Sequence, residues 1–280
     1  MPILDPFLRA VLTPAGICLI ILLMCSPPWR PSQSFGRTWA GALAHGLGYT
    51  AAFVVMFGWP GWPADEDWKW LAYVGPIGVV TGWVDGVTGV GSAIRWRVRL
   101  IGAVAAAWIL VPGWMESRPA WIAGLSLAGF VCITAIGHIA RRASALAVAI
   151  IVGITLAGVT FVLVQSGNGR FAQLSTALLA TFCARIVVIL VSGDQFTDRG
   201  GYGLAGLLIA GLSFDGLFNN YGDVPTLVFV ILAVTPLAAL IPDVGPLRDI
   251  GGWKSQALRV TIVVLVVAAC AWASVSTGET

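Results

Sequence analysis

The residue whose type and position could most readily carry chemistry is Asp85, a lone carboxylate after a long apolar run in this chain of 280 residues. If the helix formed by that run ends near Gly86, Asp85 is a helix-end carboxylate in loop water. If the helix continues to Ile94, Asp85 lies inside the membrane, where an ionisable group is a functional candidate that needs a partner such as Arg185. We predict the earlier end, because a glycine-rich segment follows. Three arginines come next: Arg95, Arg97 and Arg99.

Other residue types that commonly do chemistry are few or poorly placed. The five cysteines all fall inside apolar runs with no C-x-x-C pair, which indicates packing residues and not a metal or redox site. His45 could join Asp85 in a proton relay, although a single helix-facing histidine is more often a packing residue. No phosphate-binding loop, zinc-protease motif or dinucleotide fingerprint occurs.

Composition places the chain in a membrane. Hydrophobic residues make up 58% of it, charged residues make up 10%, and the mean hydropathy is +0.89. These values lie far from the averages of soluble domains. The formal net charge is only +3, and no basic tail that would indicate nucleic acid occurs. We therefore expect membrane lipid as a partner and no nucleic acid.

Ten apolar stretches are long enough to cross a bilayer core about 30 Å thick. They cover approximately residues 10–27, 38–59, 70–86, 100–115, 120–140, 143–167, 171–193, 201–218, 224–242 and 257–275. The predicted fold class is all-α, a polytopic membrane bundle of about ten transmembrane helices, with nine as the alternative count. We expect a single integral membrane domain over residues 1–280, with possible halves at 1–142 and 143–280. Gly78, Gly82 and Gly86 recur at four-residue spacing, which should let another helix approach closely.

The loops differ in charge, which predicts orientation. If successive loops alternate sides, one side receives eleven lysines and arginines and the other receives four. Because positive loops face the cytoplasm, both termini should lie outside it, in a protein of the cytoplasmic membrane. The acidic run Asp65-Glu66-Asp67 then belongs to the outer side, where neighbouring tryptophans fit an interfacial belt.

Four glycine-containing segments lie on the arginine-rich side, each near the start or end of a span. They are Gly36 to Leu43, Gly82 to Asp85 with the following Arg97 to Ile101, Gly193-Asp194, and Gly252 to Lys254 with Arg259. In order and place they resemble loops of the polyprenyl-phosphate sugar-1-phosphate transferases, the family of phospho-N-acetylmuramoyl-pentapeptide transferase. The similarity is best over residues 78–111. The ten spans and outer termini also resemble the layout of that family.

The resemblance implies an enzyme that moves a sugar-1-phosphate from a nucleotide-sugar to a polyprenyl phosphate at the cytoplasmic face. Such a reaction needs Mg²⁺ to neutralise phosphate charge and cationic side chains to position the phosphates. Carried over, Asp85 and Asp194 are the catalytic carboxylates and the Mg²⁺ ligands. The implied substrate-binding residues are Arg95, Arg97, Arg99, Arg141, Arg142 and Lys254. The structural alternative is that inward loops of most membrane proteins carry such arginines whatever their function.

Departures from the family pattern keep a non-catalytic role open. The second aspartate of the family's pair is Gly86 here, the last loop has no histidine cluster, and His138 to Arg142 match a further family loop in position only. A degenerate relative or a non-catalytic membrane subunit would keep the fold without the metal site. Such a chain could also form a homodimer.

A carrier is the competing class. Asp85-Gly86 and Asp215-Gly216 are 130 residues apart, and so are Pro112 and Pro242. Five spans separate the members of each pair, and an odd repeat length inverts the topology of the second half. Secondary transporters use such five-plus-five repeats to build a site near the membrane midplane from broken helices.

Overall fold

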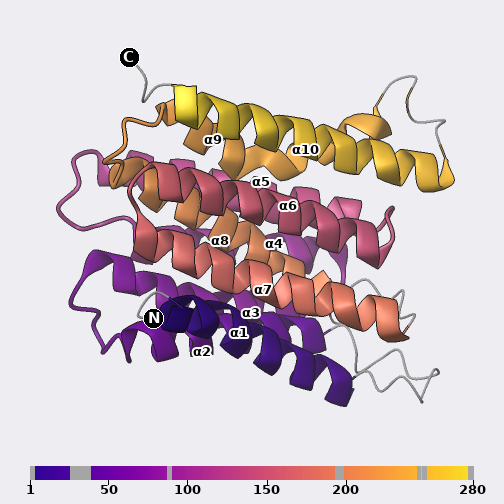
Figure 1. The fold of residues 1–280 in the computed structure, drawn as a ribbon, viewed down its shortest axis with the longest axis horizontal. Coiled ribbons are helices and arrows are strands. Elements are labelled where there is room, and N and C mark those ends of the chain that lie inside the picture. Colours follow the sequence, from indigo (N-terminus) through magenta and orange to yellow (C-terminus); the bar gives the residue numbers. More distant parts are fainter. Residues whose placement is uncertain are drawn as a thin grey trace.

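Helices and the loops that join them make up the residues that the computed structural model describes, which are 4–25, 39–86, 90–192, 199–244, 247 and 251–276. Within these residues, ten α-helices and two 3₁₀ segments of four or more residues follow one another (Figure 1). Their order is α1 (Leu4–Cys25), α2 (Ala40–Phe57), η1 (Asp67–Trp70), α3 (Leu71–Gly86), α4 (Ser92–Leu110), α5 (Arg118–Ile139), α6 (Ala145–Gln165), α7 (Gly169–Ser192), α8 (Arg199–Phe218), α9 (Thr226–Val234), η2 (Thr235–Asp243) and α10 (Gly252–Ser276). The predicted all-α membrane bundle is confirmed.

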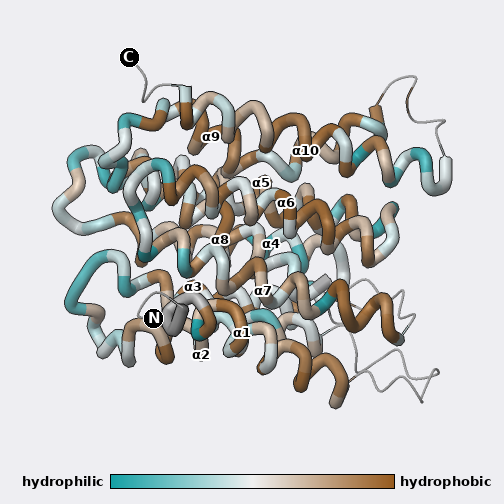
Figure 2. Tube along the Cα trace, viewed as in Figure 1, coloured by the Kyte–Doolittle hydropathy of each residue, from teal (hydrophilic) through white to brown (hydrophobic). Residues whose placement is uncertain are grey.

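Most of these helices are suited to a bilayer by length and composition. Among the described residues, eight segments are long and apolar enough to cross one, with α9 and η2 together forming a single crossing. The two other helices are α3, which has 16 residues, and α4, which carries three arginines. Hydrophobic residues run along the helices, while a conspicuous hydrophilic stretch marks the loop between α2 and α3 (Figure 2). The chain is a multi-span integral membrane protein.

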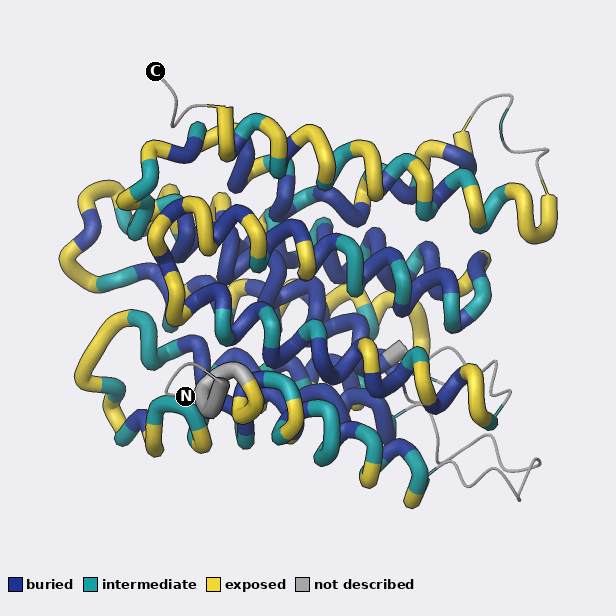
Figure 3. The backbone as a smooth tube through the Cα atoms, in the orientation of Figure 1, coloured by how far each residue is buried: buried dark blue, intermediate teal, exposed yellow. Residues whose placement is uncertain are grey.

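The helices lie side by side along one common direction, with α10 along one edge and α1 and α2 along the opposite edge (Figure 1). The first residues of α1 and the last residues of α10 lie at the same end of the bundle, as an even number of crossings requires (Figure 1). Helix α8 is central and packs on α2, α3, α5 and α9. Its residues 201–216 are all buried, and buried residues concentrate in the middle of the bundle (Figure 3).

Glycines bring α3 and α8 into close contact, as their spacing predicted. A Cβ added to Gly82 would lie 2.1 Å from the carbonyl oxygen of Gly200, and one added to Gly78 would lie 2.3 Å from Cδ1 of Leu204. The two contacts also show that α3 and α8 run antiparallel, because a later residue of α3 meets an earlier residue of α8. Small residues permit this approach where larger ones would separate the backbones.

Substitution of Gly82 with alanine should therefore destabilise the bundle. The new methyl group would meet the backbone of α8, which cannot rotate away as a side chain can. We expect a loss of about 1–3 kcal/mol of unfolding free energy, as for other overpacked sites. The matched control is Gly124→Ala on α5, where an added Cβ meets nothing within 4 Å. Thermal unfolding in detergent measures the stability of both variants, and equal unfolding midpoints for the two would contradict the close packing.

Helix α4 begins eight residues earlier than the expected span, at Ser92 in place of residue 100. Arg95, Arg97 and Arg99 therefore lie on the first turns of a helix and not in a loop. The sequence prediction treated each arginine as a break in the membrane segment. Long arginine side chains can instead extend along a helix surface toward water, so the helix continues through them.

The helix packing does not follow the five-plus-five repeat expected of a carrier. Such a repeat relates α3 to α8 and α5 to α10, so packing of α5 on α8 should be matched by packing of α10 on α3. Helix α5 does pack on α8, but α10 packs on α6, α9 and η2, and no extensive contact with α3 is found among the described residues. The paired aspartates and prolines therefore do not mark a symmetric fold.

Candidate functional site

Asp85 forms a buried ion pair with Arg99. Nη2 of Arg99 lies 2.8 Å from both Oδ1 and Oδ2 of Asp85, and Nε lies 3.1 Å from Oδ1. The side chain of Asp85 is only 4% exposed and that of Arg99 only 5%. Helix α3 ends at Gly86, as predicted, and Arg99 of α4 lies against the carboxylate of Asp85. Arg99 is thus the partner that the structure shows for Asp85, whereas the residue named for that role from the sequence was Arg185.

This geometry differs from the roles that the resemblance implied for the pair. Asp85, which was expected to bind Mg²⁺, already accepts three hydrogen bonds from a guanidinium. Arg99, which was expected to bind phosphate, is the donor of all three. Asp194 lies outside the described residues. Within the described part of the chain, no group of three or more His, Cys, Asp or Glu side chains is placed to hold a metal ion. The Mg²⁺ site stays a prediction.

The other predicted phosphate contacts are spread over the same end of the bundle, which we call the basic end. Arg95 is half-buried and Arg97 is exposed on α4, while Lys254 is exposed on the first turn of α10. Arg141 and Arg142 are exposed in the turn between α5 and α6. Of these, Arg142 has a described contact with a carboxylate on another helix.

That carboxylate is Asp243, which sequence reasoning did not identify. Nη2 and Nη1 of Arg259 lie 2.5 and 3.0 Å from its two oxygens, and Nη1 of Arg142 lies 3.1 Å from Oδ1. Nε2 of His138 is 3.9 Å from Oδ2. A cavity of about 310 Å³ opens beside this cluster, and we call it the basic pocket. The signal in the sequence is that Asp243 directly follows an apolar span, as Asp85 nearly ends one.

His45 is a packing residue. It is fully buried on α2, its Nδ1 lies 2.8 Å from the hydroxyl of Thr181, and its ring stacks on Phe182 at 4.2 Å between centroids. These partners both come from α7. They fit the packing role that a single helix-facing histidine usually has.

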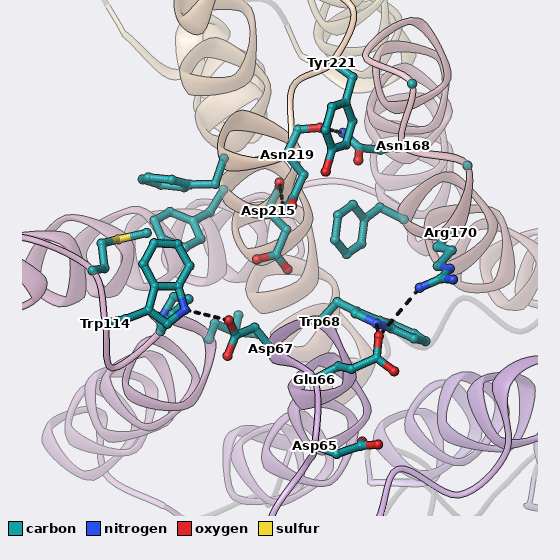
Figure 4. A pocket seen from close by; sticks show the side chains of 18 residues that line it. Asp65, Glu66, Asp67, Trp68, Trp114, Asn168, Arg170, Asp215, Asn219 and Tyr221 are labelled. Atoms are coloured by element: carbon teal, nitrogen blue, oxygen red, sulfur yellow. Dashed lines mark hydrogen bonds and ion pairs between the residues drawn. The ribbon is translucent and has the colours of Figure 1, made fainter.

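A second cavity, of about 650 Å³, lies at the opposite end of the bundle. Loops after α2, α4, α6 and α8 all contribute to its wall (Figure 4). Three neighbouring carboxylates of the first of these loops lie at it: Asp65, Glu66 and Asp67. We call this cavity the acidic pocket and this end of the molecule the acidic end.

Asp215 is the buried carboxylate of the acidic pocket. It lies near the end of α8, is 8% exposed, and points into the cavity (Figure 4). Its Oδ2 has no hydrogen-bond partner among the described residues. Since α3 and α8 are antiparallel, with Gly82 level with Gly200, Asp85 and Asp215 are separated by roughly 27 Å along the bundle. The two aspartates therefore belong to different ends and share no site.

The loop carboxylates at the mouth already have partners. Nζ of Lys69 lies 2.8 Å from Asp65 and 2.9 Å from Glu66, and these hydrogen bonds hold the pKa of each carboxyl below its ordinary value. Both groups are therefore charged at neutral pH. Asp67 accepts a hydrogen bond of 2.8 Å from the indole of Trp114. The mouth of the pocket thus has a fixed negative charge.

Arg170 is the one cation among the described residues that line the acidic pocket. Its guanidinium lies 5.1 Å above the ring of Trp68, and its Nη1 is 3.8 Å from Glu66. The indole of Trp68 also donates a hydrogen bond of 2.7 Å to Glu66. Arg170 is therefore held at the rim, on an aromatic ring and a loop carboxylate.

No protein-family model and no curated protein matches this chain. The sequence prediction missed the acidic pocket because it followed the arginines to the basic end. The available signals were Asp215 within an apolar run and three consecutive acidic residues between tryptophans.

Proposed function

We propose that the chain is a membrane carrier that takes up a small solute through the acidic pocket. The observation that carries the proposal is the buried carboxylate of Asp215 at the wall of that cavity, whose Oδ2 has no hydrogen-bond partner among the described residues. An ionisable side chain within a membrane span is costly and marks a substrate or ion pathway by default. The cavity volume of about 650 Å³ lies in the range of small-molecule sites.

The charge of the loops supports an orientation for this carrier. The basic end carries most of the lysines and arginines, which favours the cytoplasmic side of a cytoplasmic membrane, and the acidic end then faces outward with both termini. A solute would reach Asp215 from outside. The asymmetric helix packing means that any inward opening uses movements of single helices around α8 and not the exchange of two equivalent halves.

The transferase is the second candidate, and the basic pocket is the observation that favours it. Arg142 and Arg259 meet there beside the first turn of α10, which also carries Lys254. The resemblance places phosphate contacts in these two segments, and guanidinium groups bind phosphate oxygens well. Asp85 supports this candidate less, because Arg99 covers it. A nucleotide-sugar and a polyprenyl phosphate, with Mg²⁺, are the corresponding ligands.

The carrier should exchange solute across liposomes that contain the purified chain. We expect at least one class among labelled organic cations, amino acids and sugars to equilibrate faster than in protein-free liposomes. Asp215→Asn should slow that exchange, because the amide keeps the shape and removes the charge. Asp223→Asn is the matched control, since Asp223 is exposed at the same end and does not line the pocket.

Two outcomes would count against the carrier. Exchange that is equal in Asp215→Asn and Asp223→Asn would remove Asp215 from the pathway. Absence of exchange together with Mg²⁺-dependent turnover of a nucleotide-sugar and a polyprenyl phosphate would favour the transferase.

A further inference from the structure

We infer that the acidic pocket selects an organic cation with at least one N–H group, and that Asp215 is its counter-charge. This inference rests on the proposed solute-binding role of the pocket and names the class of solute. It follows from three properties of the cavity: its charge, its aromatic wall and the number of carboxylates that could contact one bound ion.

Charge comes first. Among the described lining residues, four carboxylates face the one guanidinium of Arg170: Asp65, Glu66, Asp67 and Asp215. Three of the four are engaged by Lys69 or Trp114 at the mouth. Asp215 is the one that is more than nine-tenths buried and has an oxygen without a partner. A buried carboxylate oxygen without a hydrogen bond is destabilising, so a ligand that donates to it gains more than it would at an exposed group.

The aromatic wall favours a cation over a neutral donor. Phe171, Phe214 and Phe218 line the cavity together with Trp68 and Trp114. The faces of such rings attract positive charge when the cation lies within about 6 Å of the ring centre. The pocket already shows this interaction, because the guanidinium of Arg170 lies 5.1 Å above Trp68. The apolar rings also provide surface for the organic part of a ligand.

The side chains of the pocket suit an organic cation better than a bare metal ion, because metal ions need more ligands. Ca²⁺ takes six to eight oxygen ligands, and Mg²⁺ demands an octahedral set. No cluster of three or more acidic, histidine or cysteine side chains suited to a metal occurs in the described part of the chain. A single carboxylate beside aromatic rings supplies too few oxygen ligands to bind such ions well. It suits an ammonium group, which needs one acceptor and an apolar surface.

The type of ammonium follows from Oδ2 of Asp215. A primary, secondary or tertiary ammonium can donate an N–H to that oxygen and also neutralise it. A quaternary ammonium brings the charge without a donor, so it would leave the oxygen unsatisfied. Arg170 has the opposite influence, because its charge at the rim repels an entering cation.

Binding to the full-length protein in detergent at neutral pH tests the inference with three probes of similar size. They are 2-phenylethylammonium, its N,N,N-trimethyl derivative and 3-phenylpropionate. We expect the ammonium to bind best, the trimethyl derivative more weakly and the carboxylate least, as measured by isothermal titration. Asp215→Asn should weaken ammonium binding by roughly tenfold to a hundredfold, the loss of one charge-assisted hydrogen bond. Asp223→Asn should not change it.

A second variant should strengthen ammonium binding where Asp215→Asn weakens it, and it keeps the test valid if Asp215→Asn does not fold. Arg170→Gln removes a repelling charge from a side chain that is 65% exposed, so the fold should tolerate it and ammonium binding should become tighter. Preference for 3-phenylpropionate in the native protein would overturn the inference. Ammonium affinity that is unchanged in both pocket variants would do the same.

Failure of this inference and failure of the carrier give different results. Ammonium binding that depends on Asp215, without exchange across liposomes, would support the pocket and refute the carrier. Exchange of an uncharged or anionic solute that depends on Asp215, without ammonium binding, would support the carrier and refute the cation.

Discussion

Replacement of Asp85 with alanine should lower the free energy of unfolding by about 3–5 kcal/mol. The substitution would leave the guanidinium of Arg99 buried with no carboxylate to accept its hydrogen bonds. Desolvation of an unpaired charge is what makes the loss of one partner so costly. Arg99→Ala should cost a similar amount for the same reason. Unfolding of the purified protein in detergent, followed by circular dichroism, gives both values.

The double variant Asp85→Leu with Arg99→Met separates a structural pair from a catalytic one. Apolar residues of similar size often replace a buried ion pair with little loss of stability, so the double variant should unfold much nearer the native protein than either single variant. Asp65→Ala is a control from the exposed pair with Lys69, and it should change stability little. Native stability in Asp85→Ala, combined with loss of a Mg²⁺-dependent activity, would instead identify Asp85 as a catalytic carboxylate.

Much of the fold could be predicted because the bilayer imposes strong rules on sequence. Spans need about 20 apolar residues, and the arginine-rich loops mark one side. The end of α3 at Gly86 and the close approach at Gly82 were predicted for local reasons, since glycine both ends helices and lets helices touch. The start of α4 was predicted too late, because arginine on a helix near the interface resembles arginine in a loop when only sequence is read.

The sites were harder to predict because they depend on tertiary contacts. The pairing of Asp85 with Arg99 joins residues 14 positions apart on two helices, so it depends on how α3 and α4 pack on each other. The acidic pocket gathers segments from four separate loops, of which the sequence marks only the acidic one. From the sequence, Asp215 was named only as half of a repeated Asp-Gly pair, and the fold is needed to show that a cavity reaches its side chain.

Arg259 should be the second residue whose loss destabilises the protein strongly. Its side chain is 3% exposed, it donates two hydrogen bonds to Asp243, and a third of 2.8 Å goes to the carbonyl oxygen of Ala239. Arg259→Met would keep much of the apolar stem and leave both acceptors without these donors. We expect a loss of about 3 kcal/mol of unfolding free energy, measured as for Asp85.

Arg142→Met is the matched variant, because Arg142 approaches the same carboxylate from an exposed position. Its side chain is 44% exposed and lies 3.1 Å from Oδ1 of Asp243, so its contribution to stability should be below about 1 kcal/mol. Equal destabilisation by the two variants would show that Asp243 depends on both arginines for the fold. The expected difference makes Arg142 the informative residue for the basic pocket. If Arg142→Met weakens binding of a nucleotide-sugar without changing stability, that arginine contacts phosphate, and the transferase gains direct support over the carrier.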